Sequence, residues 1–138
     1  MRLAAALVLA VIPSVTLAMT QTKELPAPQA GLWHLLLQGQ DEKNLPDNRT
    51  DLRLYPTPAP FRAAIVNYAT GDEFPYPVAV FDGRTLTLQM GAHGGGSLPG
   101  TPLLRLAWDG TKFEGTYVDP AFQPLAKSPR LKLVRSAK

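Results

Sequence analysis

A histidine followed by three glycines, His93 to Gly96, is the stretch of this sequence that most directly suggests chemistry. Runs of this kind supply backbone amides to the oxyanion hole in a group of ester hydrolases. That chemistry also needs a nucleophilic serine in a G-x-S-x-G turn, together with an acid and a second histidine. Ser97 follows the glycines, but Pro99 stands where the turn needs its last glycine. An esterase is therefore the weakest hypothesis, and a glycine-rich loop between two strands is favoured.

The other residues that could hold a metal or exchange a proton are few and scattered. The chain has no cysteine and 2 histidines, His34 and His93. Asp41, Glu42 and Asp47 share one polar loop, but they lack the spacing and the central glycine of a calcium-binding EF-hand. The sequence therefore predicts a protein that is not an enzyme, with no catalytic residue, no metal site and no cofactor.

The first eighteen residues, MRLAAALVLAVIPSVTLA, have the three parts of a secretory signal. Arg2 is the basic part, Leu3 to Ile12 the apolar part, and Thr16 to Ala18 the small-residue cleavage site. Pro13 interrupts the apolar run, which falls short of the roughly 20 residues that span a bilayer. We expect cleavage after Ala18, a periplasmic or secreted protein, and no stable membrane insertion afterwards.

Composition places the rest of the chain in one domain without covalent cross-links. The chain has 14 Lys and Arg residues against 11 Asp and Glu, a net charge of +3, and the basic residues form no patch typical of nucleic-acid binding. No nucleic-acid partner is expected. Residues 19–30 are polar and contain prolines, which indicates a flexible leader, and residues 31–138 form the predicted domain.

From Gly31 onward, short apolar runs alternate with turn residues, as is typical of all-β domains. Asp82-Gly83 and Asp109-Gly110 are signals for tight hairpins. We expect a single antiparallel up-and-down barrel of about eight strands, since closure removes exposed sheet edges, with a two-sheet sandwich as the alternative. The expected strands are Leu32–Gln38, Asp51–Tyr55, Phe61–Tyr68, Val78–Phe81, Thr85–Met90, Leu103–Trp108, Lys112–Val118 and Leu131–Arg135.

Alternation along these strands predicts which side chains point inward. Trp33 and Leu35 share one face of the first strand, whereas His34 lies on the other and should face solvent or a neighbouring chain. In the last strand, Leu133 and Arg135 share a face, so an inward arginine needs a partner. A guanidinium stacked on the indole of Trp33 would supply one.

At its two ends the chain resembles the lipocalins and their calycin relatives. Gly31-Leu32-Trp33 fits the G-x-W that opens the lipocalin barrel, and Arg135 occupies the place of the arginine that packs across that tryptophan. The resemblance implies a barrel with structural roles for Gly31, Trp33 and Arg135. More faintly, residues 60–68 and 113–118 are similar to small β-domains that accompany thioredoxin-like or hydrolase domains in exported bacterial proteins.

The leading functional hypothesis is an exported barrel that binds a small apolar or amphipathic ligand in its interior or at its mouth. The polar members Asn67, Arg105 and Tyr117 would orient such a ligand. The alternative is an interaction module of the cell envelope, an inhibitor or assembly factor, that meets a protein partner around Tyr55, Phe74, Tyr76 and Phe122. The predicted ligand-binding residues are Trp33, Leu35, Asn67, Leu88, Met90, Arg105, Phe113 and Tyr117.

Overall fold

The computed structural model describes residues 24–67, 69–90 and 101–137. The predicted signal peptide and the glycine-rich stretch of residues 91–100 lie outside these ranges, so the expectations placed on them remain predictions. Among the described residues no helix is long and apolar enough to cross a membrane.

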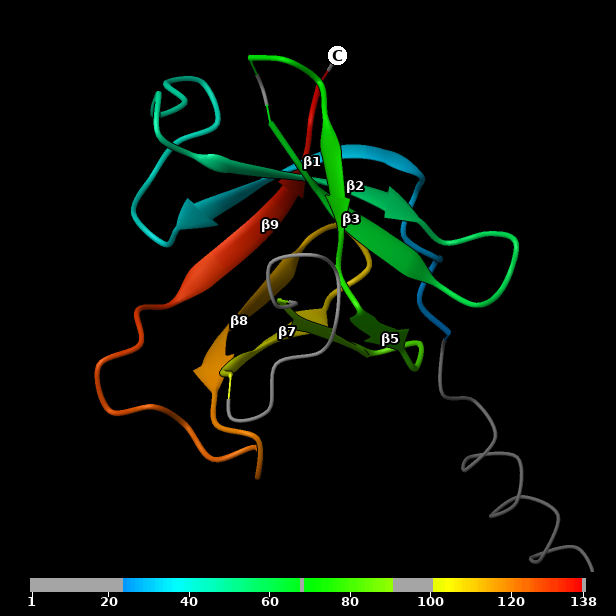
Figure 1. Ribbon diagram of the computed structural model, residues 1–138, viewed down its shortest axis with the longest axis vertical. Coiled ribbons are helices and arrows are strands. Elements are labelled where there is room, and N and C mark those ends of the chain that lie inside the picture. Colours follow the sequence, from blue (N-terminus) through cyan, green and yellow to red (C-terminus); the bar gives the residue numbers. More distant parts are fainter. Residues whose placement is uncertain (1–23, 68, 91–100, 138) are drawn as a thin grey trace, which may run out of the picture.

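The described chain is built from strands that run alternately up and down, as the period-two patterns predict (Figure 1). Each predicted strand is present, with bounds that differ by at most two residues. One short strand, β4, was not expected, because no strand was predicted between Tyr68 and Val78. The strands are β1 Gly31–Leu37, β2 Thr50–Tyr55, β3 Arg62–Val66, β4 Glu73–Pro75, β5 Val78–Phe81, β6 Thr85–Gln89, β7 Leu103–Trp108, β8 Phe113–Val118 and β9 Leu131–Arg135.

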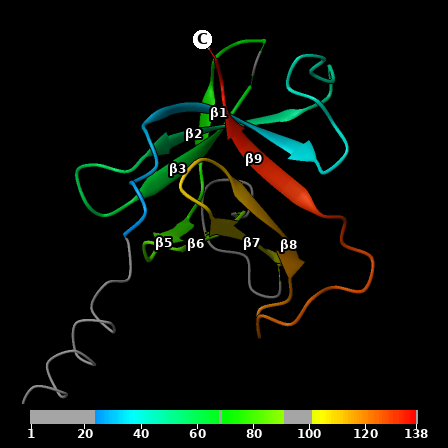
Figure 2. The same cartoon turned by 180° about the vertical axis from the view of Figure 1, so that it is seen from behind.

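All nine strands belong to one antiparallel sheet in the order β4-β3-β2-β1-β9-β8-β7-β6-β5. The sheet is strongly curled into a half-barrel, so that β2 and β3 lie opposite β6 to β8 (Figures 1 and 2). Its two edge strands, β4 and β5, are consecutive in the chain and are joined only by Tyr76 and Pro77. The all-β, single-sheet, up-and-down prediction is confirmed, and the two-sheet alternative is not what the chain adopts.

The inward face carries the apolar residues that alternation assigned to it. Leu52, Leu54, Leu86, Leu88, Leu104 and Leu106 are almost completely buried in one cluster with the aromatic residues. Trp33 and Phe113 are 1% and 0% exposed, and their ring centroids lie 5.5 Å apart in an edge-to-face arrangement. Trp108 packs against both rings. This aromatic group fills one end of the half-barrel.

The leader residues next to this end are tied to the sheet. The indole Nε1 of Trp108 donates to the carbonyl oxygen of Pro26 at 2.7 Å, and that of Trp33 donates to the carbonyl of Gln29 at 3.1 Å. Leu25 packs against the buried cluster. Residues 25–29 of the predicted flexible leader therefore close the aromatic end of the fold.

Both Asp-Gly sequences form the predicted hairpin turns. Gly83 and Gly110 have φ angles of 99° and 98°, a region that favours glycine. The preceding aspartates accept backbone hydrogen bonds, for example from the amide of Thr85 to Asp82 at 2.7 Å and from that of Lys112 to Asp109 at 2.8 Å. These amide bonds lower the pKa of both carboxyl groups.

Candidate functional site

The end of the half-barrel away from the tryptophans contains a cavity of about 180 Å³. Four of the predicted ligand-binding residues, Leu35, Leu88, Met90 and Tyr117, line it. They come from β1, β6 and β8 and from the residue after β6, because inward-facing positions of neighbouring strands converge there. The other lining residues are Thr50, Ile65, Tyr76, Pro102 and Leu104.

Two phenols give this cavity its polar character. Among the described residues, neither the Tyr76 nor the Tyr117 hydroxyl has a hydrogen-bond partner, and no buried side-chain nitrogen or oxygen there lacks one. Both hydroxyls must therefore open toward accessible space. Burial raises the pKa of Tyr76, with a further contribution from neighbouring Tyr117, and burial also raises the pKa of Tyr117. Both phenols stay protonated and can donate a hydrogen bond.

A groove of about 460 Å³ adjoins the cavity and shares Met90, Pro102 and Tyr117 with it. Its far wall comes from the proline-broken segment between β8 and β9. Ser128 fixes this segment, because its hydroxyl oxygen accepts from the Tyr117 amide at 2.9 Å and also contacts the Thr116 hydroxyl. Lys127 is the one charged residue among those described in its lining, which otherwise comprises Thr101, Leu125, Ser128 and Pro129.

The other four predicted ligand-binding residues lie away from the cavity. Trp33 and Phe113 face inward, but they pack in the aromatic group and do not line it. Asn67 and Arg105, which were predicted to orient a ligand, line neither this cavity nor the groove beside it. Asn67 begins the turn after β3, where its side chain accepts from the amide of Ala69, and Arg105 points outward with its guanidinium 4.5 Å from the ring centroid of Phe122.

Gly31, Trp33 and Arg135 meet at the junction of β1 and β9, but not in the predicted stack. Trp33 and Arg135 are direct partners in the register. The guanidinium donates to the carbonyl oxygen of Ala30, at 3.0 Å from its terminal nitrogen, and Arg135 is exposed. The same nitrogen lies 3.1 Å from the place of a Cβ on Gly31, whose φ is 127°. The described ring partners of the indole are Trp108 and Phe113, so the expected burial of Arg135 was wrong.

Sequence reasoning missed a buried polar group on the outer face of β1 and β2. His34 lies on the face predicted for it, but it is only 6% exposed rather than open to solvent. Its Nδ1 lies 2.7 Å from Oδ1 of Asp51, which is 2% exposed and also accepts from Nε of Arg49 at 3.0 Å. The sequence held one signal of this group. Asp51 is a charged residue in a strand of alternating pattern, and pairing of that strand with the preceding one places it beside His34.

The chemistry considered for the glycine-rich stretch lies outside the described residues, since His93 and Ser97 both belong to it. The described part of the chain contains no group of three or more His, Asp or Glu residues that could hold a metal ion.

Comparisons with known proteins give no assignment: no family model, no curated protein and no solved structure matches the chain.

Proposed function

We propose that this protein binds a small apolar or amphipathic ligand in the cavity and groove at the open end of the half-barrel. The observation that carries the proposal is an apolar cavity with two largely enclosed phenol hydroxyls, Tyr76 and Tyr117, that have no protein partner among the described residues. Both hydroxyls reach accessible space, so each can donate a hydrogen bond to a molecule that enters the cavity. A ligand carrying a carbonyl or carboxylate oxygen would accept these hydrogen bonds.

The size of the space favours a ligand that extends along both parts. Small-molecule sites in proteins usually enclose about 300–1,000 Å³. The cavity alone, at about 180 Å³, is smaller, whereas the adjoining groove of about 460 Å³ brings the site into that range. Apolar burial would contribute roughly 25 cal/mol per Å². The exposed Lys127, which lines the groove, would attract an anionic head group of an amphipathic ligand.

A lipocalin-like carrier exported to the periplasm or the medium is the protein class that we infer. The curled up-and-down sheet and the meeting of Gly31, Trp33 and Arg135 at one end support this inference. The signal-like first eighteen residues support export.

A titration with the neutral apolar fluorophore N-phenyl-1-naphthylamine tests the proposal. We expect saturable fluorescence enhancement, and a loss of affinity of about tenfold or more in Met90→Lys, because a lysine at the shared wall brings a charge into the apolar site. Val80→Lys is the matched control, since Val80 is also exposed, at 57% against 48%, and lies on β5 outside the site. Absence of saturable binding, or equal affinity in both variants, would contradict the proposal.

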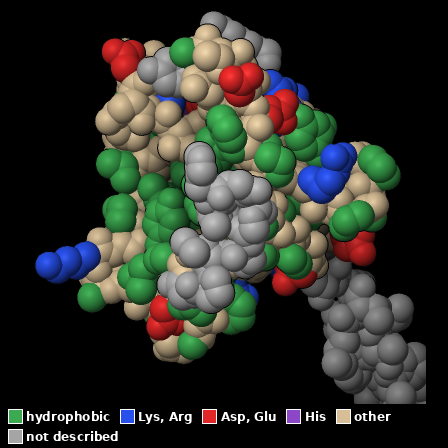
Figure 3. Space-filling model, in the orientation of Figure 1, with side chains coloured by type: hydrophobic (Ala, Val, Ile, Leu, Met, Phe, Trp, Pro, Cys, Tyr) green, Lys and Arg blue, Asp and Glu red, His purple; other side chains and the backbone are tan. Residues whose placement is uncertain are grey.

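A second candidate, an interaction module, is favoured by hydrophobic side chains that lie on the surface. Phe74 and Val80, on the two edge strands β4 and β5, are 58% and 57% exposed. Hydrophobic side chains also gather on the face of the molecule drawn in Figure 3. Tyr76 of the predicted contact surface instead lines the cavity, and Tyr55 donates to Glu73 at 2.6 Å. Binding of an envelope protein that Phe74→Ser abolishes, without fluorophore binding, would favour this candidate.

A further inference from the structure

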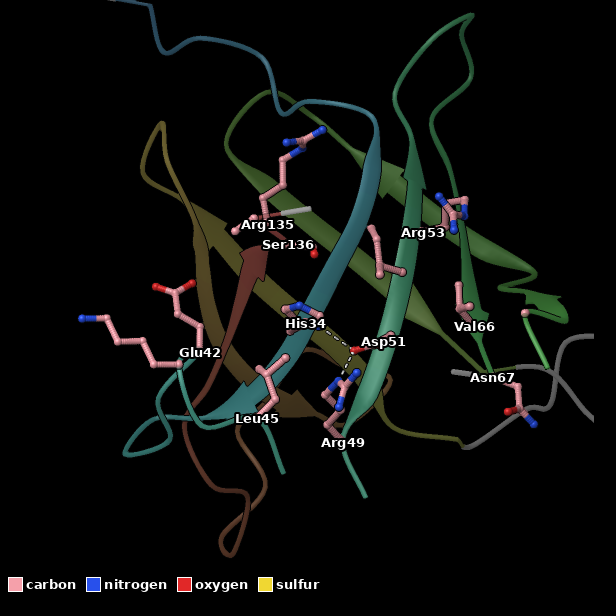
Figure 4. A pocket seen from close by; sticks show the side chains of 14 residues that line it. His34, Glu42, Leu45, Arg49, Asp51, Arg53, Val66, Asn67, Arg135 and Ser136 are labelled. Atoms are coloured by element: carbon pink, nitrogen blue, oxygen red, sulfur yellow. Dashed lines mark hydrogen bonds and ion pairs between the residues drawn. The ribbon is translucent and has the colours of Figure 1, made fainter. Parts of the chain in front are cut away.

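A second, larger cleft lies on the outer face of β1, β2 and β3, away from the proposed ligand cavity. It encloses about 740 Å³ and is bordered by the loop between β1 and β2 and by the residues that follow β9 (Figure 4). Leu32, Leu45 and Val66 supply apolar wall, while the charged side chains come from several elements. The charged and titratable lining residues are His34, Glu42, Lys43, Arg49, Asp51, Arg53 and Arg135.

His34, Asp51 and Arg49 form a connected polar group at the centre of this cleft (Figure 4). Asp51 is the partner of His34 in the β1–β2 register, so their side chains emerge side by side on one face. A carboxylate only accepts hydrogen bonds, and therefore Nδ1 of His34 carries the proton in the 2.7 Å contact. Arg49 holds the same carboxylate oxygen from the other side at 3.0 Å. The ring orientation of His34 is thereby fixed.

The second ring nitrogen of His34 opens into the cleft. Among the described residues Nε2 has no hydrogen-bond partner, although the residue as a whole is 94% buried. No buried side-chain nitrogen or oxygen of the described residues is left without a partner, so Nε2 must reach accessible space. A fixed imidazole with one nitrogen aimed into a cleft is the arrangement by which proteins offer a histidine to a ligand.

The charges around Nε2 favour an anion. Lys43, Arg49, Arg53 and Arg135 line the cleft, against two lining carboxylates, Glu42 and Asp51. The carboxylate of Asp51 is already paired with His34 and Arg49. Nε of Arg53 lies 3.4 Å from Oε2 of Glu73, but this pair is half-exposed and therefore competes only weakly with a ligand for the guanidinium. The described residues offer no third ligand of the kind that a metal site needs.

We propose that this cleft binds a small organic carboxylate, with one carboxylate oxygen at Nε2 of His34 and the apolar body of the ligand against Leu32, Leu45 and Val66. A carboxylate oxygen only accepts hydrogen bonds, so the form of His34 that binds this ligand is the imidazolium, in which Nδ1 donates to Asp51 and Nε2 donates to the ligand. Arg53 and Lys43 attract the carboxylate from the rim. This site does not depend on the cavity inside the half-barrel.

Benzoate and methyl benzoate, added to the full chain and followed by backbone amide NMR, separate this site from the interior one. We expect benzoate to shift amide resonances on the outer residues of β1 and β2, and we expect the uncharged ester to leave these resonances unchanged. Shifts confined to the residues of the interior cavity would overturn the proposal and leave the interior function standing. Equal shifts from the ester on β1 and β2 would also overturn it, because the cleft would then recognise only apolar surface.

Two variants test the residues that carry the argument. His34→Gln should weaken benzoate binding about tenfold, the loss expected when a hydrogen bond to a charged group is removed. The double variant Lys43→Gln/Arg53→Gln keeps the buried group intact and should weaken binding about threefold to tenfold through the lost charges. The double variant tests the proposed carboxylate site even if His34→Gln does not fold. Lys112→Gln is the control, since Lys112 pairs with Asp109 and Glu114 outside the cleft. Unchanged affinity in the double variant would overturn the proposal.

Discussion

Replacing Gly115 with alanine probes how closely β7 and β8 approach each other. Gly115 lies on the inward side of β8, between Phe113 and Tyr117, and is the register partner of Leu106. A Cβ built on Gly115 would lie 1.9 Å from the carbonyl oxygen of Arg105 and 2.9 Å from the Cα of Leu106. Both are backbone atoms, so no side chain can rotate away to relieve the contact.

The cost of this substitution follows from the distance that the strands must yield. Carbon and carbonyl oxygen rarely approach closer than about 3.3 Å, so the backbones must separate by more than 1 Å at this point. Overpacking of this kind costs about 1–3 kcal/mol, and a weakened ladder hydrogen bond adds about 1 kcal/mol. The smaller conformational freedom of alanine in the unfolded chain returns about 0.4–1 kcal/mol. We therefore expect a net loss of about 2 kcal/mol, or a fall in Tm of roughly 8 °C.

Urea and thermal unfolding of Gly115→Ala, followed by circular dichroism, measure this loss. Gly39→Ala is the matched control, since a Cβ on Gly39 meets no atom within 4 Å and its φ lies outside the region reserved for glycine. It should leave stability within about 1 kcal/mol of the wild type. If Gly115→Ala unfolds at the same urea concentration as Gly39→Ala, the close approach of the two strands is refuted.

Three further predictions concern charged and titratable groups. Asp51→Asn should cost roughly 3 kcal/mol in urea unfolding because it breaks a buried pair, whereas Glu73→Gln, in a half-exposed pair with Arg53, should cost under about 1 kcal/mol. The lowered pKa values of Asp82 and Asp109 stabilise the fold above their ordinary value of 3.8, and this contribution is lost as the pH falls. Urea midpoints should therefore drop less between pH 5 and pH 3 in Asp82→Asn/Asp109→Asn. Because the folded pKa of Tyr76 is raised above 10.0, stability is lost as the pH rises past that value, and Tyr76→Phe should lose less between pH 8 and pH 11.

Period-two alternation was sufficient to predict the strands and the face that each buries. Leu104, Leu106 and Trp108 form the apolar set of β7, and the structure buries all three on the inward side. The same reasoning placed Leu35 and Leu88 at the interior, where they line the cavity. These predictions succeed because a one-residue slip would move every such side chain into water.

Alternation did not predict the short strand β4, and it did not predict whether the small residues leave empty space. β4 has three exposed residues and ends at Pro75, so no burial pattern distinguishes it from a turn, yet it forms an edge of the sheet. A small inward-facing residue can leave room for a ligand, but at Gly115 the backbone of Arg105 and Leu106 occupies the place of the missing side chain. Among other small residues of the strands, Ala63 and Ala79 face the core, whereas Ala107 is exposed. Whether a small residue leaves a cavity depends on the distance between the neighbouring strands, which the sequence does not give.

The cleft around His34 could not be predicted from period-two alternation. Alternation predicts the face of the strand on which a residue lies, but it does not predict which other segments cover that face. His34 and Asp51 lie on the outer side of β1 and β2, which alone would leave both in water. The loop between these strands supplies Arg49, whose Nε reaches Asp51, and Leu45, which helps to wall the cleft. Burial of an ionised aspartate is tolerated only with such partners, since an unpaired buried charge is costly. The loop therefore determines whether His34 and Asp51 are exposed to solvent or enclosed in a cleft. The course of a loop over a sheet cannot be predicted from the periodicity of the sequence.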